Sequence, residues 1–213
     1  MTSKLITEFI GTFFLMATII LTVASGSLLA PVAIGSMLMV MVYMGGHISG
    51  AHYNPAVSLA AWMRGLMTQG DMIKYIAAQI LAAVVASFVA MHLAGQLIVP
   101  SPAEGQMVGA LVAEFLFTFA LVLVILNVAA TDETAGNSYF GLAIGFTVAA
   151  GAFAVGDISG GAFNPAVGLG PALTDAIMGD AGHLADVWLY LVGPFGGGAA
   201  GAWVYGLMNK PAS

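Results

Sequence analysis

Six long stretches of this chain are almost free of charged residues, and they restrict its possible folds more than any other feature. A helix needs roughly 20 mostly apolar residues to cross a bilayer. Charged residues make up only 7% of the chain, whereas soluble domains carry about 25%. We therefore predict an all-α membrane protein with six transmembrane helices. The predicted spans are Leu5–Val23, Pro31–Gly46, Met72–Leu93, Met107–Ala129, Tyr139–Val155 and Asp186–Met208.

The few charged residues predict the orientation. An even number of spans places both termini on one side of the membrane. All four basic residues then fall on that side, which the positive-inside rule makes cytoplasmic, and we expect the cell's inner (plasma) membrane. The same four residues are too few for a nucleic-acid-binding patch. They are Lys4, Arg64, Lys74 and Lys210.

A ten-residue segment occurs twice in the chain. Residues Ile48–Val57 read ISGAHYNPAV and residues Ile158–Val167 read ISGGAFNPAV, so seven of ten positions are identical. Three predicted spans lead from one copy to the next, so the second copy enters the membrane from the opposite side. We predict an inverted repeat, with halves at about 1–96 and 106–213 in a single channel domain over residues 1–213. Such repeats place their site near the bilayer midplane.

Each copy leads into an apolar remnant too short to span a membrane, at Asn54–Trp62 and Asn164–Thr174. Asn caps helices and Pro is tolerated at the first helical position, so we predict two re-entrant half-helices that run away from the midplane. The glycine-rich stretches Gly45–Gly50 and Gly156–Gly161 are expected to form irregular loops with free carbonyl groups. The half-helix N-termini would meet at the centre, each with about half a positive charge. Such a centre accepts a neutral hydrogen-bonding solute and repels cations.

Two glutamates, Glu8 and Glu114, lie inside predicted spans, where a carboxylate is costly and needs partners. We expect each to accept hydrogen bonds from the backbone of the re-entrant loop in its half; a proton relay is the alternative. His47 is expected to bond the same backbone or to modulate the cytoplasmic mouth with pH. Ser49 and Ser159 are assigned to loop support, because a duplicated serine with one nearby histidine does not make a catalytic triad. No metal site is expected, since no third ligand stands near the first loop.

Two Asn-Pro-Ala boxes on re-entrant half-helices, in an inverted six-span repeat, resemble the aquaporin and aquaglyceroporin (major intrinsic protein) family. The resemblance extends over essentially the whole chain and includes the paired glutamates. It implies a right-handed bundle of six helices and two half-helices, a homotetramer with one pore per subunit, passive permeation, no cofactor and no enzymatic activity. The pore-lining boxes are Asn54, Pro55 and Ala56, and Asn164, Pro165 and Ala166.

The chain departs from the family at the constriction that selects solutes. The family usually has an arginine just after the second box, and Val167 stands there in this chain. Counting from the boxes, the resemblance places the other constriction positions at Ile34, Ala152 and Gly161. No side chain in this set bears a charge or a hydrogen-bond donor. The resemblance therefore implies a wide, uncharged selectivity filter.

We expect a passive channel in the lipid bilayer for water and small uncharged solutes, such as glycerol, urea or undissociated metalloid acids such as arsenous acid. The metalloid solutes follow from a second resemblance, at Ala172, Tyr190 and Leu191, to metalloid-carrying relatives of plant intrinsic proteins. The alternative is an ion- or proton-coupled secondary transporter of a small solute, because that class is also built from inverted repeats.

Overall fold

The computed structural model describes residues 1–209, which form helices and no strand. Lys210, expected beside the other basic residues, lies outside the described part of the chain. All six long helices are long and apolar enough to cross a membrane, so the predicted all-α, multi-pass architecture is confirmed. The long helices are α1 (Thr2–Ala24), α2 (Ala30–Ser49), α4 (Gln69–Ala94), α5 (Met107–Ala129), α6 (Phe140–Ser159) and α8 (Val187–Met208).

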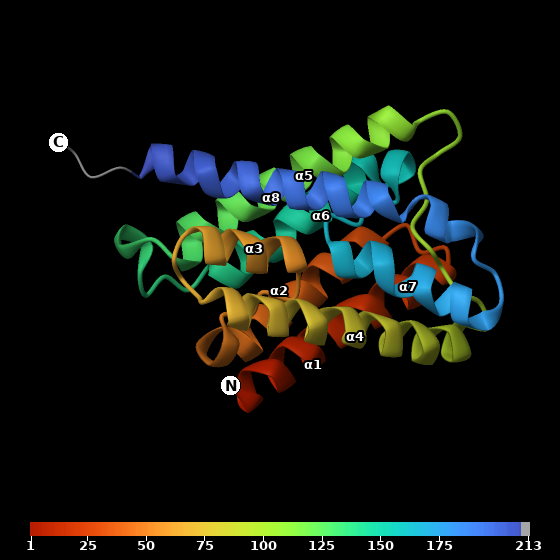
Figure 1. Ribbon diagram of the computed structural model, residues 1–213, viewed down its shortest axis with the longest axis horizontal. Helices are drawn as coiled ribbons and strands as arrows, with labels where there is room; N and C mark the ends of the chain where they lie inside the picture. Colours follow the sequence, from red (N-terminus) through yellow and green to blue (C-terminus); the bar gives the residue numbers. More distant parts are fainter. Residues whose placement is uncertain (210–213) are drawn as a thin grey trace.

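Two short helices, α3 (Pro55–Met63) and α7 (Pro165–Met178), lie inside the bundle. Figure 1 shows them roughly end to end, with their N-termini turned toward each other near the middle of the molecule. Helix α1 begins and α8 ends at the same end of the bundle, which we call the termini face (left in Figure 1). Helix α3 runs from the centre to the termini face, and α7 runs to the opposite face. The expected pair of re-entrant half-helices is therefore present.

The two halves pack in corresponding ways. Helix α1 packs on α2 and α4, and α5 packs on α6 and α8. Each half-helix crosses to the other half, since α3 packs on α8 and α7 packs on α4. The helix pair α2 and α6 meets at Gly35 and Gly145, where a Cβ at Gly35 would lie 2.5 Å from the Gly145 carbonyl oxygen. Small residues at such crossings let helix backbones approach closely in lipid.

The glycine-rich stretches differ from the expectation, because most of each is helical. Helices α2 and α6 continue to Ser49 and Ser159, three to four residues beyond the predicted ends at Gly46 and Val155. Each helix ends at a glycine in the left-handed conformation, Gly50 (φ 89°) and Gly160 (φ 83°). A left-handed glycine is a common helix stop, so the irregular segments before the capping asparagines are confined to residues 51–53 and 161–163. Any ladder of free carbonyls is correspondingly short.

Candidate functional site

The N-termini of α3 and α7 are joined by their capping asparagines. Asn54 Oδ1 accepts a hydrogen bond from Ala56 N, and Asn164 Oδ1 accepts one from Ala166 N, both at 2.9 Å. Each amide nitrogen donates across to the other half: Asn54 Nδ2 to Phe163 O and Asn164 Nδ2 to Tyr53 O, again at 2.9 Å. A primary amide has two N–H donors. One hydrogen of each asparagine thus remains for a molecule in the cavity that both side chains line.

The first loop is folded around the carboxylate of Glu8, which is fully buried. Glu8 Oε1 accepts hydrogen bonds from Ser49 Oγ at 2.6 Å and His52 N at 3.0 Å, and Oε2 accepts from Tyr53 N at 2.7 Å and Gln79 Nε2 at 2.8 Å. These bonds compensate the cost of placing the carboxylate inside a membrane-spanning helix. They also hold Tyr53 in the left-handed region, at a φ of 50°.

Glu114 holds the second loop in the same way. Its oxygens accept from Ser159 Oγ at 2.8 Å, Ala162 N at 2.9 Å and Phe163 N at 2.6 Å. The hydrogen bonds expected between each glutamate and its loop backbone are therefore present. Neither carboxylate is among the residues lining the central cavity, which leaves a proton relay through that cavity without a structural basis. The serines also close each turn, accepting from Ala51 N and Gly161 N.

A central cavity of about 30 Å³ lies beside the two asparagines. A space of roughly 10–15 Å³ measured in this way holds one water molecule, so the cavity accommodates a short file of waters. Its wall combines the polar loop residues with aliphatic side chains. The aliphatic wall includes Leu15, Ile19, Ile34, Leu38, Val57, Leu121, Ile125, Ile144, Val148 and Val167.

Three of the four expected filter residues line this cavity: Ile34, Gly161 and Val167. Ala152 is not among the residues lining this cavity, and its place in the constriction stays a prediction. Its Cα would lie 3.6 Å from a Cβ built on Gly161, so Ala152 stands beside the loop. Helix α6 turns Val148 to the cavity instead, one helical turn before Ala152.

Two larger cavities connect this centre to the termini face. One, of about 410 Å³, shares Ala51, Ile125 and Ile144 with the central cavity. The other, of about 240 Å³, shares His52, Val57 and Ile125 with it. The lining residues thus run without a break from the asparagine pair to the termini face.

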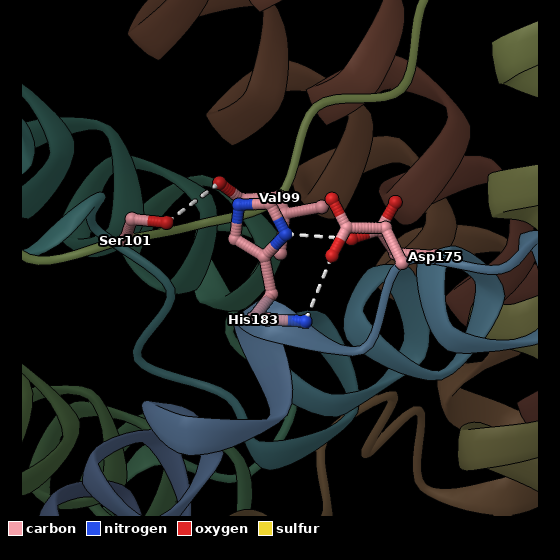
Figure 2. A network of polar contacts seen from close by, with 6 residues as sticks. Val99, Ser101, Asp175 and His183 are labelled. Carbon is pink, nitrogen blue, oxygen red and sulfur yellow. Dashed lines mark hydrogen bonds and ion pairs between the residues drawn. The ribbon is translucent and has the colours of Figure 1, made fainter.

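One of the two roles expected of His47, a hydrogen bond to the loop backbone, is not found among the described residues. His47 is exposed on the last turn of α2, and among residues 1–209 its ring makes no hydrogen bond to the loop backbone. Near the opposite face lies a second histidine, His183. Its Nδ1 lies 2.6 Å from Asp175 Oδ2 (Figure 2), so an acidic partner already faces it.

Comparisons with known proteins agree with this geometry. The family model described as "Major intrinsic protein" matches residues 1–205. The chain belongs to the major intrinsic protein family. Members of this family are membrane channels for water and small solutes, and this chain is such a channel and not an enzyme.

Curated relatives in the family are plant aquaporins. The chain is 39% identical to aquaporin NIP1-4 of Oryza sativa subsp. japonica, over 96% of this chain and 76% of the relative. It is 40% identical to aquaporin NIP1-1 of Zea mays, over 98% of this chain and 76% of the relative. The structure of the aquaglyceroporin from Plasmodium falciparum superposes with a TM-score of 0.81 at 24% identity, covering 96% of this chain and 95% of that one. That likeness concerns the fold.

Sequence reasoning missed several polar residues around the loops. Tyr75 donates to Ser49 O at 2.8 Å, and Tyr190 donates to Ser159 O at 2.6 Å. Both tyrosines come from helices remote from the repeated segment, so only an alignment of the third and sixth spans could have paired them. Gln79 and Ser58 were missed too, because no counterpart in the second half marks them as a repeat.

Proposed function

We propose that this channel conducts water and small uncharged solutes passively, through an outer constriction that has no fixed positive charge. The position of Val167 supports this proposal. The residue is 2% exposed and lines the central cavity together with Ile34 and Gly161. An arginine at that position would bring a permanent cation and several donors. With an aliphatic side chain there, cation rejection depends on the two half-helix N-termini.

The proposed solutes are water, glycerol, urea and undissociated metalloid acids such as arsenous acid. All are neutral and bear groups that bond to the spare amide hydrogens of Asn54 and Asn164. Small side chains at Gly161 and Ala152 favour solutes wider than water.

We further propose that the protein resides in the plasma membrane with both termini in the cytoplasm, as a homotetramer. The charges support this orientation, because Lys4, Arg64 and Lys74 are exposed at the termini face. The opposite face exposes Glu104, Asp157 and Asp180 and, among the described residues, no lysine or arginine, as the positive-inside rule requires. Cross-linking of the purified protein in lipid nanodiscs tests the tetramer, and protease accessibility of tagged termini in intact cells tests the orientation.

The experiment that tests the solute range is stopped-flow light scattering of reconstituted vesicles with water, glycerol, urea, boric acid and arsenous acid. Permeability to water and to at least one larger solute, linear in the solute gradient, is expected. Permeability to water alone would contradict the proposal of a wide filter. Saturable flux that a proton gradient drives uphill would favour the coupled transporter instead.

A further inference from the structure

A chain of hydrogen bonds links Glu8 to the ring of His52. Gln79 Nε2 lies 2.8 Å from Glu8 Oε2 and 3.0 Å from Ser58 Oγ. Ser58 Oγ in turn lies 3.0 Å from His52 Nδ1. Glu8, Ser58 and Gln79 are each fully buried, so bulk water does not compete for these bonds.

The direction of each bond follows from the groups involved. The Glu8 carboxylate receives four donors and acts only as an acceptor, so Gln79 must turn its NH₂ toward it. The second amide hydrogen of Gln79 goes to Ser58 Oγ. Ser58 is left with its own hydrogen, and His52 Nδ1 is the acceptor within reach. Nδ1 therefore carries the lone pair, and the proton of the neutral ring is on Nε2.

This arrangement leaves one polar atom unsatisfied. Gln79 Oε1 is buried and has no hydrogen-bond partner among the described residues. An unpaired buried carbonyl costs free energy and calls for an explanation. The explanation we infer is that both amide hydrogens are needed where they are, one on Glu8 and one on Ser58.

The second half builds its loop without this chain of bonds. Tyr75 and Tyr190 donate to the carbonyls of Ser49 and Ser159, and aligning these tyrosines places Gln79 opposite Pro194. Aligning the Asn-Pro-Ala boxes places His52 and Ser58 opposite Ala162 and Gly168. Glu114 nevertheless holds residues 162 and 163 as Glu8 holds 52 and 53. A re-entrant loop therefore does not require the network, which occurs only on the termini side.

His52 lies in the wall of two of the cavities. It lines both the central cavity and the cavity of about 240 Å³ at the termini face. Its Nε2 is on the side of Gly50, being 3.2 Å from a Cβ built there, and Gly50 lines the cavities at the termini face. The proton-bearing nitrogen is thus the one on the Gly50 side of the ring.

We propose that Gln79 and Ser58 are positioning residues that fix His52 as an Nε2–H donor, and that this donor selects among neutral solutes bearing an oxygen acceptor. The donor would be the next fixed hydrogen-bonding group after the asparagine pair for a solute moving toward the termini face. The selection rests on the proposed channel function, whereas the ring tautomer does not.

The tautomer is tested by ¹⁵N NMR of the imidazole nitrogens in full-length protein in nanodiscs. The chain has four histidines, so His52 is assigned by comparison with single His47, His92 and His183 substitutions. The wild type is expected to hold one tautomer, with Nε2 protonated, and Ser58→Ala and Gln79→Leu are expected to give mixed tautomers. Ser87→Ala is the matched control, because this buried hydroxyl on α4 bonds only Ala83 O. A protonated Nδ1 in the wild type, or one unchanged tautomer in both variants, overturns the assignment.

Solute selection is tested by the ratio of glycerol to water permeability in the same vesicles. Loss of one oriented hydrogen bond should change this ratio by about threefold to tenfold in Ser58→Ala and Gln79→Leu, with Ser87→Ala equal to wild type. A mixed tautomer with an unchanged ratio overturns the selective role. If wild-type vesicles conduct neither solute, the proposed function fails, and the NMR result still decides the positioning role.

Discussion

Asn54 and Asn164 each use the two ends of one amide for different purposes. The oxygen caps the half-helix that the asparagine begins, and the nitrogen bonds the backbone of the opposite loop. Val167 lies in the first turn of α7, and its uncharged side chain lines the same cavity. At this scale, the structure combines central amide donors with an aliphatic cavity wall.

Val167→Cys places the first thiol in a protein without cysteine. The wild type is expected to resist thiol-directed mercurials, and the variant is expected to lose most of its water flux when mercury blocks the cavity. Stopped-flow shrinkage before and after mercurial treatment measures this. Glu104→Cys, at an exposed position outside the cavity, is the control that should stay open. The placement of Val167 in the cavity would be contradicted if mercury blocked the wild type, or if it failed to block Val167→Cys.

Glu114→Gln is expected to destabilise the fold. The amide keeps one acceptor oxygen but turns an NH₂ group toward donors that need acceptors, at a cost of about 2 kcal/mol or more. Thermal unfolding in detergent, followed by circular dichroism or native tryptophan fluorescence, measures the loss. Glu104→Gln removes an exposed carboxylate and should leave the melting temperature unchanged; equal effects from the two variants would refute the loop-support role.

At the scale of the elements, close helix crossings hold the half-helices in place. Gly145 of α6 packs against α2, and a Cβ there would lie 2.8 Å from Met39 Cβ and 3.0 Å from Met39 N. Gly156, on the same helix, has no neighbour within 4 Å of an added Cβ. Two glycines of one helix therefore have different roles, which their local sequence does not reveal.

Gly145→Ala should lower the free energy of unfolding by about 1–3 kcal/mol, because a methyl group is forced into a tight crossing. Gly156→Ala should be neutral or stabilising by up to about 1 kcal/mol, since alanine is the better helix former. Thermal melting of the two variants side by side compares them. A more damaging Gly156→Ala would mean that the α2–α6 crossing is not where the structure has it.

Much of the element scale was predictable, and the failures have physical causes. Six spans, two half-helices and the glutamate–loop bonds follow from apolar length, the Asn-Pro helix starts and the cost of a buried carboxylate. A glycine-rich sequence predicts irregular backbone, which is why these stretches are expected to be loops. In the structure, most of those glycines instead serve helix packing or a helix stop. The place of Val148 in the cavity wall could not be predicted, because counting from the box ignores the orientation of α6. Gln79 could not be found, since its role depends on two partners remote in the sequence, Glu8 and Ser58.

At the scale of the whole molecule, the chain is an inverted assembly whose halves differ in polarity. The lining is aliphatic around Val167, whereas the termini side has His52 and its hydrogen-bonded support. The exposed basic residues of the described chain lie at the termini face, far from the constriction. A neutral solute therefore crosses a path in which the fixed positive potential comes from the half-helix N-termini.

The role of the uncharged side chain at position 167 is tested most directly by comparing wild type with Val167→Arg and Val167→Met in the same reconstituted vesicles. Water, glycerol and arsenous acid permeabilities and proton leak are recorded together, and the methionine variant controls for bulk without charge. We expect arginine to restrict the larger solutes and to lower the proton leak, and methionine to affect size selection alone. If Val167→Arg changes neither the solute range nor the leak, the uncharged constriction does not determine what this channel conducts.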